Sequence, residues 1–190
     1  AGVTDSFSNP ANWQGGVVPT NDGTSRLQLP LATGPEVMVL PDGALVIDSI
    51  YLTLGSYYGT SYRFSSAGAT TLSLAAGINS PNHGYSRSVQ FDPAVTINLT
   101  ADQTWTPSYV IVGGAMGGPG KLTIQPHSYY SSSYLNQGYL QLNGPGNFTG
   151  GLNVYNTTLT LGHAQALDGS GPVFLYEVRL ETPLQLNLNR

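Results

Sequence analysis

Residues 138–162 read GYLQLNGPGNFTGGLNVYNTTLTLG, and this stretch decides the fold of the chain. It contains three short runs in which apolar and polar residues alternate, at 139–142, 152–154 and 158–161, separated by turns rich in glycine and asparagine. Alternation with a period of two is typical of a strand with one buried and one exposed face. Strands this short, joined by such turns, indicate a chain that bends sharply every few residues.

The same alternation recurs along the rest of the chain, at 26–29, 44–47, 50–54, 71–74, 95–99, 121–124, 173–175 and 184–188. Helical periodicity is nearly absent, and only 162–167 is expected to form a helical turn. No single unit of this size can bury its apolar face alone, whereas parallel stacking of units buries like residues over like. The sequence therefore predicts an all-β fold, a parallel β-helix (solenoid), with a β-sandwich or jelly roll as the alternative.

The composition narrows the class of protein. The 190 residues suit one domain, 1–190, with a single core. Only 8% of residues are charged, against about 25% in typical proteins, but a hydrophobic fraction of 40% supplies enough burial for folding. Lys121 is the only lysine and the arginines are scattered, so nucleic acid is not an expected partner. There is no cysteine and no apolar run long enough to insert into a membrane.

The segment 138–173 resembles the autotransporter-associated β-strand repeat of exported bacterial proteins. The matching residues are Gly146, Thr149, Gly150, Gly151, Leu159, Leu161, Gly162, Ala166, Leu167, Ser170 and Gly171, while Asp168 with Gly169 departs from the repeat by one inserted residue. The best-matching region is 117–175. The resemblance implies a right-handed parallel β-helix in a secreted or cell-surface protein, and it implies no catalytic residues.

The first 30 residues differ from the repeats and are expected to form an N-terminal cap. Asn12 and Trp13, with Gly15, Gly16 and Pro19, resemble segments that flank the repeats in large exported proteins, as does 102–105. Trp13 and Trp105 are expected to be packing anchors or cap residues, because an isolated tryptophan among apolar neighbours is usually buried. The end of the sequence at 188–190, with no polar tail, suggests a piece of a longer protein.

Aromatic clusters among serine, glycine and asparagine are the candidate binding residues: Tyr57, Tyr58, Tyr62, His83, Tyr85, Tyr109, Tyr129, Tyr130 and Tyr134. The steps from Tyr58 to Tyr85, Tyr109 and Tyr130 are close to the length of one solenoid repeat, so these rings are expected to form a ladder on one face. Tyrosine with small polar residues is the composition of adaptable recognition surfaces, and tyrosine rings also stack on sugars. The alternative is that the rings cover loop stems and stack on one another.

Catalysis is not expected. Most of the ten acidic residues lie beside glycine, proline or asparagine, as at Asp22, Asp42 and Asp168, where a carboxylate ordinarily accepts turn N–H groups. The three histidines have no partner at metal-ligand spacing, so neither a metal nor a cofactor is expected. A polysaccharide lyase or hydrolase fragment is a further alternative, and it would require an acid, a base and a cation clustered on one face.

We therefore expect a non-enzymatic extracellular or cell-surface β-helix segment for adhesion, attachment or filament assembly. The alternative function is a carbohydrate-binding module of a secreted polysaccharide-active enzyme. Expected partners are a glycan or other surface ligand, and a second copy of the chain through the open ends of the solenoid, since unpaired strand edges favour association.

Overall fold

The chain is almost entirely β-structure, with all strand pairs parallel. The computed structural model describes residues 4–29, 36–53, 61–80, 88–107, 109–126 and 138–182. In these ranges the chain forms three parallel sheets and two short 3-10 helices, η1 (Pro10–Asn12) and η2 (Gln14–Gly16). Parallel pairing throughout the described strands excludes the antiparallel sandwich that the sequence left open. No helix in these ranges is long and apolar enough to cross a membrane.

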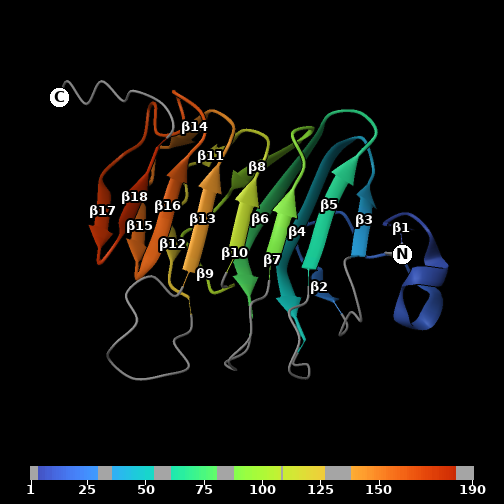
Figure 1. Cartoon of the computed structure of the whole chain (residues 1–190). Helices are drawn as coiled ribbons and strands as arrows, with labels where there is room; N and C mark the ends of the chain where they lie inside the picture. Colours follow the sequence, from blue (N-terminus) through green and yellow to red (C-terminus); the bar gives the residue numbers. More distant parts are fainter. Residues whose placement is uncertain are drawn as a thin grey trace.

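Sheet A forms one long face of the molecule (Figure 1). Its strands, in spatial order, are β1 (Thr4–Ser6), β3 (Glu36–Leu40), β5 (Ser61–Ser66), β7 (Ser88–Phe91), β10 (Tyr109–Val112), β13 (Gly138–Leu142), β16 (Thr157–Leu161) and β18 (Arg179–Glu181).

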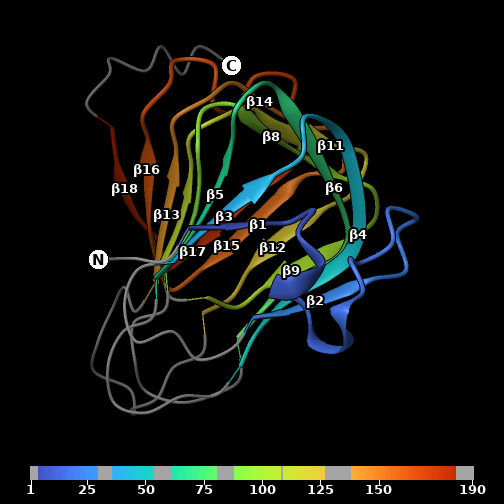
Figure 2. The same ribbon diagram turned by 90° about the vertical axis from the view of Figure 1, so that its right-hand side faces the viewer.

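Sheets B and C form the other two sides. Sheet B contains β2 (Arg26–Leu29), β4 (Gly43–Leu52), β6 (Thr70–Asn79), β8 (Val95–Leu99), β11 (Met116–Gly118) and β14 (Gly146–Phe148). Sheet C contains β9 (Gln103–Trp105), β12 (Leu122–Ile124), β15 (Leu152–Tyr155) and β17 (Val173–Tyr176). Figure 2, which looks at the N-terminal end, shows the strands surrounding a common interior.

From β7 to β16 the chain visits the three sheets in a fixed order: A, B, C, then A again. We call one such passage a rung. Residues at equivalent positions of neighbouring rungs lie 19 to 30 positions apart in sequence, as between Leu140 and Leu159 or between Val110 and Leu140. In the earlier rungs β4 is a single long strand, and its pairing with β6 shifts between Ile47 and Ser49. This arrangement is compatible with a parallel β-helix.

The interior is built from columns of apolar side chains that repeat from rung to rung. Val89, Val110, Leu140 and Leu159 occupy one column of sheet A, and each is at most 1% exposed. Burying a leucine or valine completely stabilises the fold by about 1.5–3 kcal/mol relative to leaving it exposed. Because every rung adds another member to each column, the stacking itself creates the core.

Aromatic rings fill the middle of the interior. Phe64 and Phe91 stack with ring centroids 5.1 Å apart, and the Phe91 ring contacts that of Trp105 at 6.4 Å. Trp105 is fully buried and its indole N–H donates to the Gln103 side-chain oxygen at 2.9 Å. Trp105 is therefore a packing anchor, as the sequence predicted.

The segment 162–171 takes the place of a sheet B strand after β16, and it forms hydrogen-bonded turns without a helix where a helical turn was expected. Its backbone forms successive tight turns, with N–H groups of Ala166 and Asp168 donating to the carbonyls three residues before them. The Gly146 N–H donates to the Gln165 carbonyl, and a Cβ at Gly146 would clash with the Ala166 carbonyl oxygen. The close approach of this turn segment to β14 therefore requires glycine at position 146, which is one of the residues that match the repeat motif.

The N-terminal residues 4–29 cover one end of the stack (Figure 2). β1 pairs with β3, and β2 pairs with β4. Phe7 is 3% exposed and packs edge-on against Trp13 at 5.3 Å, while the Trp13 indole N–H donates to the Phe7 carbonyl at 2.7 Å. Trp13 thus anchors the segment that carries η1 and η2. The run 184–188, expected to be a strand, lies outside the described residues.

Candidate binding surface

The nine aromatic residues expected to bind a ligand are placed only in part. Seven lie outside the described residues: Tyr57, Tyr58, His83, Tyr85, Tyr129, Tyr130 and Tyr134. The ranges that contain them join β4 to β5, β6 to β7 and β12 to β13, so each range leads into a strand of sheet A. The two described members, Tyr62 and Tyr109, lie in very different environments.

Tyr62 belongs to the interior and not to an exposed loop. It lies in β5, alternates with the buried Phe64, and is only 5% exposed. The sequence interpretation grouped it with Tyr57 and Tyr58 because the three are close in sequence. The alternation of Tyr62, Arg63 and Phe64 is the strand signal that this grouping overlooked.

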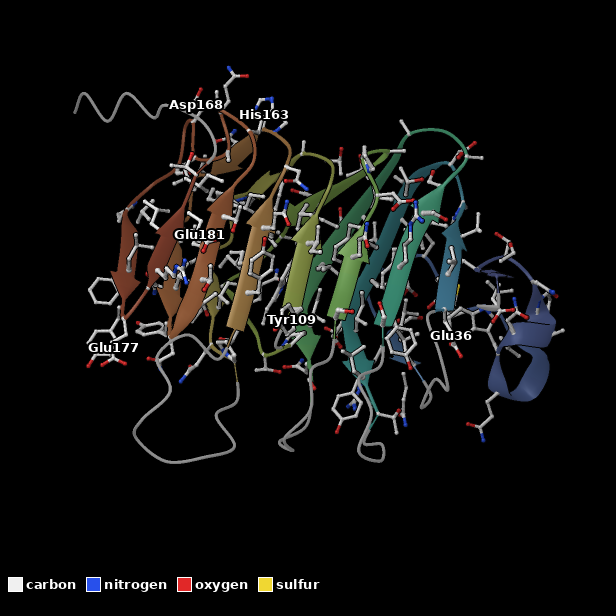
Figure 3. All side chains as sticks on the ribbon, viewed as in Figure 1. Glu36, Tyr109, His163, Asp168, Glu177 and Glu181 are labelled. Carbon is white, nitrogen blue, oxygen red and sulfur yellow. The ribbon has the colours of Figure 1, made fainter. Side chains whose placement is uncertain are left out.

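Tyr109 is on the outer face of sheet A, where it begins β10 and is 42% exposed (Figure 3). Its ring contacts that of Tyr139 on the adjacent strand β13, with centroids 5.8 Å apart and an interplanar angle of 35°. Tyr139 was not predicted as a binding residue. Its signal was the alternation with Leu140 and Leu142, which turns the tyrosine ring away from the core.

Small polar side chains continue the tyrosine pair along the outer face. The paired positions in this row, from β5 to β18, are Ser61, Ser88, Tyr109, Tyr139, Thr158 and Arg179. The neighbouring row contains Arg63, Gln90, Ile111, Gln141, Thr160 and Glu181. Hydroxyl and amide groups therefore lie at regular strand spacing, about 4.8 Å, on both sides of the two rings.

Hydrogen bonds fix the orientation of these groups. The Tyr139 hydroxyl donates to the Gln141 side-chain oxygen at 3.0 Å, and the Gln141 amide donates to the Asn143 side-chain oxygen at 2.8 Å. On the other side, the Ser88 hydroxyl bonds that of Ser61 at 2.8 Å. The surface is therefore ordered before any ligand arrives, which reduces the entropy lost on binding.

One ion pair borders the surface. The Arg63 guanidinium donates to both oxygens of Asp92, at 2.6 and 2.9 Å, and this contact raises the pKa of Arg63. Asp92 is 13% exposed and Arg63 is 53% exposed, so the carboxylate is the buried partner that positions the guanidinium. A bidentate pair leaves little net charge on this part of sheet A.

A separate cavity of about 660 Å³ lies at the N-terminal end. Asp5 and Glu36 line it together with Trp13, Tyr62 and Arg26. Burial, and secondarily the negative charge of Asp5, raises the pKa of Glu36. The Arg26 guanidinium, which also lines the cavity, stacks on the Tyr51 ring at 4.0 Å.

Three other carboxylates have structural partners. Asp22 accepts from the backbone and hydroxyl of Thr24, Asp42 accepts from the Gly68 N–H at 2.7 Å, and Asp102 accepts from the Lys121 N–H at 2.8 Å. Among the described residues no three His, Asp or Glu side chains gather in the geometry of a metal site. Sheet B has a groove of about 380 Å³, lined by residues that include Thr96, Asn98, Met116 and Asn147, without aromatic rings.

Comparison of the chain with family models, with curated proteins and with solved structures finds no match.

Proposed function

We propose that the three sheets form a right-handed parallel β-solenoid with residues 1–30 as its N-terminal cap. The cyclic visits to sheets A, B and C and the in-register apolar columns support the solenoid. The packing of Phe7 and Trp13 supports the cap. The resemblance of 138–173 to the autotransporter-associated repeat supports the handedness and an extracellular or cell-surface location.

The function that this architecture supports best is non-catalytic attachment, with the outer face of sheet A binding an extended, uncharged polysaccharide. The observation that favours it is the Tyr109–Tyr139 pair, whose rings contact each other at 5.8 Å on an ordered polar face. Sugar rings present apolar C–H faces to aromatic rings and hydroxyl groups to amides and hydroxyls, and this surface offers both kinds of contact. Its low net charge fits a neutral polymer.

The test is binding of the chain to an array of neutral and acidic glycans, followed by calorimetry with the best ligand. Tyr109→Ala and Tyr139→Ala should each weaken binding at least about tenfold, because stacking on a sugar is lost. Tyr155→Ala is the matched control, since that ring contacts Phe174 at 5.9 Å on the outer side of sheet C. Equal affinity of all three variants, or no glycan bound by the parent chain, would refute the proposal.

A hydrolase is the second candidate, favoured by the Asp5 and Glu36 carboxylates in the N-terminal cavity. Glycoside hydrolysis uses two carboxyl groups whose pKa values differ, one as acid and the other as base or nucleophile. If the cavity is such a site, the chain releases reducing ends from a polysaccharide, and Asp5→Asn and Glu36→Gln each abolish the release. Glycan binding without any bond cleavage would leave attachment as the function.

A further inference from the structure

The C-terminal end of the stack exposes columns that are buried in the preceding rungs. Val173, Leu175 and Leu180 pair with the interior residues Leu152, Val154 and Leu159, yet they are 37%, 42% and 43% exposed. The side chains point toward the interior, and no described residue stacks on their far side. This end therefore presents an apolar surface of the kind that protein interfaces cover.

The backbone at this end is also unpaired on one side. β17 and β18 are the terminal strands of sheets C and A in the described part of the chain, each bonded to one neighbour only. A strand edge with free N–H and C=O groups is a template for pairing with another strand. Phe174 and Tyr176, each 51% exposed, border the end and contact the Tyr155 ring at 5.9 and 6.2 Å.

The charges on β18 are arranged to complement a second copy of themselves. Arg179 and Glu181 flank Leu180 on the outer face, and their side chains contact each other at 3.0 Å. If two β18 strands pair antiparallel with Leu180 opposite Leu180, Arg179 of each copy lies opposite Glu181 of the other. A two-fold interface requires this kind of self-complementarity, and opposite charges across an antiparallel pair stabilise it.

The N-terminal end does not offer a matching surface. It is covered by the segment in which Phe7 packs against Trp13, and Asp5 and Glu36 line the cavity there. Docking the C-terminal end onto that surface would bring Glu181 as well as Arg179 to Asp5, Glu36 and Arg26, so three carboxylates would be removed from water against two guanidinium groups. Burial of unpaired charge is costly, so the end-to-end contact is favoured between two C-terminal ends.

We propose that two copies of this chain associate through their C-terminal ends, with the two β18 strands paired antiparallel about Leu180. The product is a closed dimer in which the sheet A strands of both copies form one continuous sheet. A two-fold contact of this kind closes on itself and does not propagate into a filament.

Sedimentation analysis of the full chain over a concentration series tests the proposal. Arg179→Glu or Glu181→Arg alone places like charges opposite each other and should raise the dimer dissociation constant at least about tenfold. The double exchange Arg179→Glu with Glu181→Arg should restore dimerisation. The matched control is Lys121→Glu, a charge reversal in the body of the stack at a residue whose side chain is 44% exposed. It should leave the dimer dissociation constant unchanged.

A cysteine cross-link tests the register independently of charge. The chain has no cysteine, so a single Leu180→Cys variant has one thiol per copy, and directly opposed residues of an antiparallel pair have Cβ atoms about 5 Å apart. Mild oxidation should give a disulfide-linked dimer, whereas Thr123→Cys on sheet C should stay monomeric. A monomer at all concentrations, assemblies that grow without limit, or equal cross-linking of the two variants would overturn the proposal.

Discussion

The two ends of the stack differ in how the apolar interior is covered. At the N-terminal end the interior is covered by Phe7, 3% exposed, and by Trp13, which packs on it and donates to its carbonyl. At the C-terminal end Leu175 and Leu180 keep the residue types of the interior columns but are 42% and 43% exposed. At the C-terminal end residue type follows the column, while burial depends on whether another layer lies above; at the N-terminal end the column of Leu180 begins with Glu36.

The largest expected effect on stability comes from two leucines of one column that differ in burial. Leu159 and Leu180 are paired neighbours in sheet A, 0% and 43% exposed. Leu159→Ala should lower the free energy of unfolding by about 3 kcal/mol, because it leaves a cavity in a closed interior. Leu180→Ala should cost about 1 kcal/mol, because the site is already open to water.

Urea denaturation of both leucine variants, at a dilution where the chain is monomeric, measures the difference. Equal losses would show that the last rung is covered as completely as the inner ones, and the contrast between the two ends would disappear.

The second effect concerns the N-terminal anchor. Trp13→Ala should cost about 2 kcal/mol, because it removes the edge-on contact with Phe7 and leaves the Phe7 carbonyl without its indole donor. Phe174→Ala, at the opposite end and 51% exposed, should cost less than about 1 kcal/mol. Thermal unfolding of both variants gives the comparison, and Trp13→Phe, which keeps a ring but not the donor, should lie between Trp13→Ala and the parent. A loss for Phe174→Ala as large as that for Trp13→Ala would contradict the capping role.

The third effect lies in the corners between sheets C and A. Asn156 and Glu177 occupy corresponding corners of successive rungs, with φ of 48° and 51° (Glu177 is labelled in Figure 3). Asparagine tolerates this left-handed conformation better than glutamate. Glu177→Asn should therefore stabilise the last rung by about 0.5–1 kcal/mol, and Asn156→Glu should destabilise its neighbour by a similar amount. Calorimetry can detect both changes, and shifts of the same sign would refute the explanation.

The sequence predicted three of the four described strands of sheet C, and β13 and β16 of sheet A, but it missed the other described strands of sheet A. Leu122–Ile124 and 158–161 alternate leucine or isoleucine with threonine, so their strands were evident. β3 reads EVMVL, with no polar residue to mark its outer face, so its strand character comes from register with neighbouring rungs, which a local pattern does not contain. β7 reads SVQF and does alternate, so in that strand a local signal was overlooked.

The binding surface was less predictable than the fold, for the same reason. Regular steps between tyrosines suggested a ladder through Tyr58, Tyr85, Tyr109 and Tyr130; only Tyr109 lies in the described residues, and the strand pairing places it between Ser88 and Tyr139. Rung length varies from 19 to 30 residues, as the pairs Leu140 with Leu159 and Val110 with Leu140 show. Equal spacing in sequence is therefore a poor guide to neighbours in this chain.

The smallest expected effect tests the chemistry of the N-terminal end through pH. Burial and the charge of Asp5 raise the pKa of Glu36 in the folded chain above its usual range. The folded state therefore favours the protonated form, and this contribution to stability is present below about pH 4.5 and lost as pH rises through the raised value. Glu36→Gln should raise the melting temperature at pH 7 relative to the parent and lose that advantage near pH 4.

Asp102 is the control, because its contribution to stability changes with pH in the opposite direction. Its pKa is lowered, chiefly by the Lys121 backbone N–H and further by the Lys121 charge, so its contribution to stability is present above about pH 4 and lost as pH falls through the lowered value. Asp102→Asn should therefore reduce stability at pH 7 and approach the parent in acid. If Glu36→Gln follows the same direction as Asp102→Asn, the folded chain stabilises the charged form of Glu36, and the explanation by burial and by the charge of Asp5 is refuted.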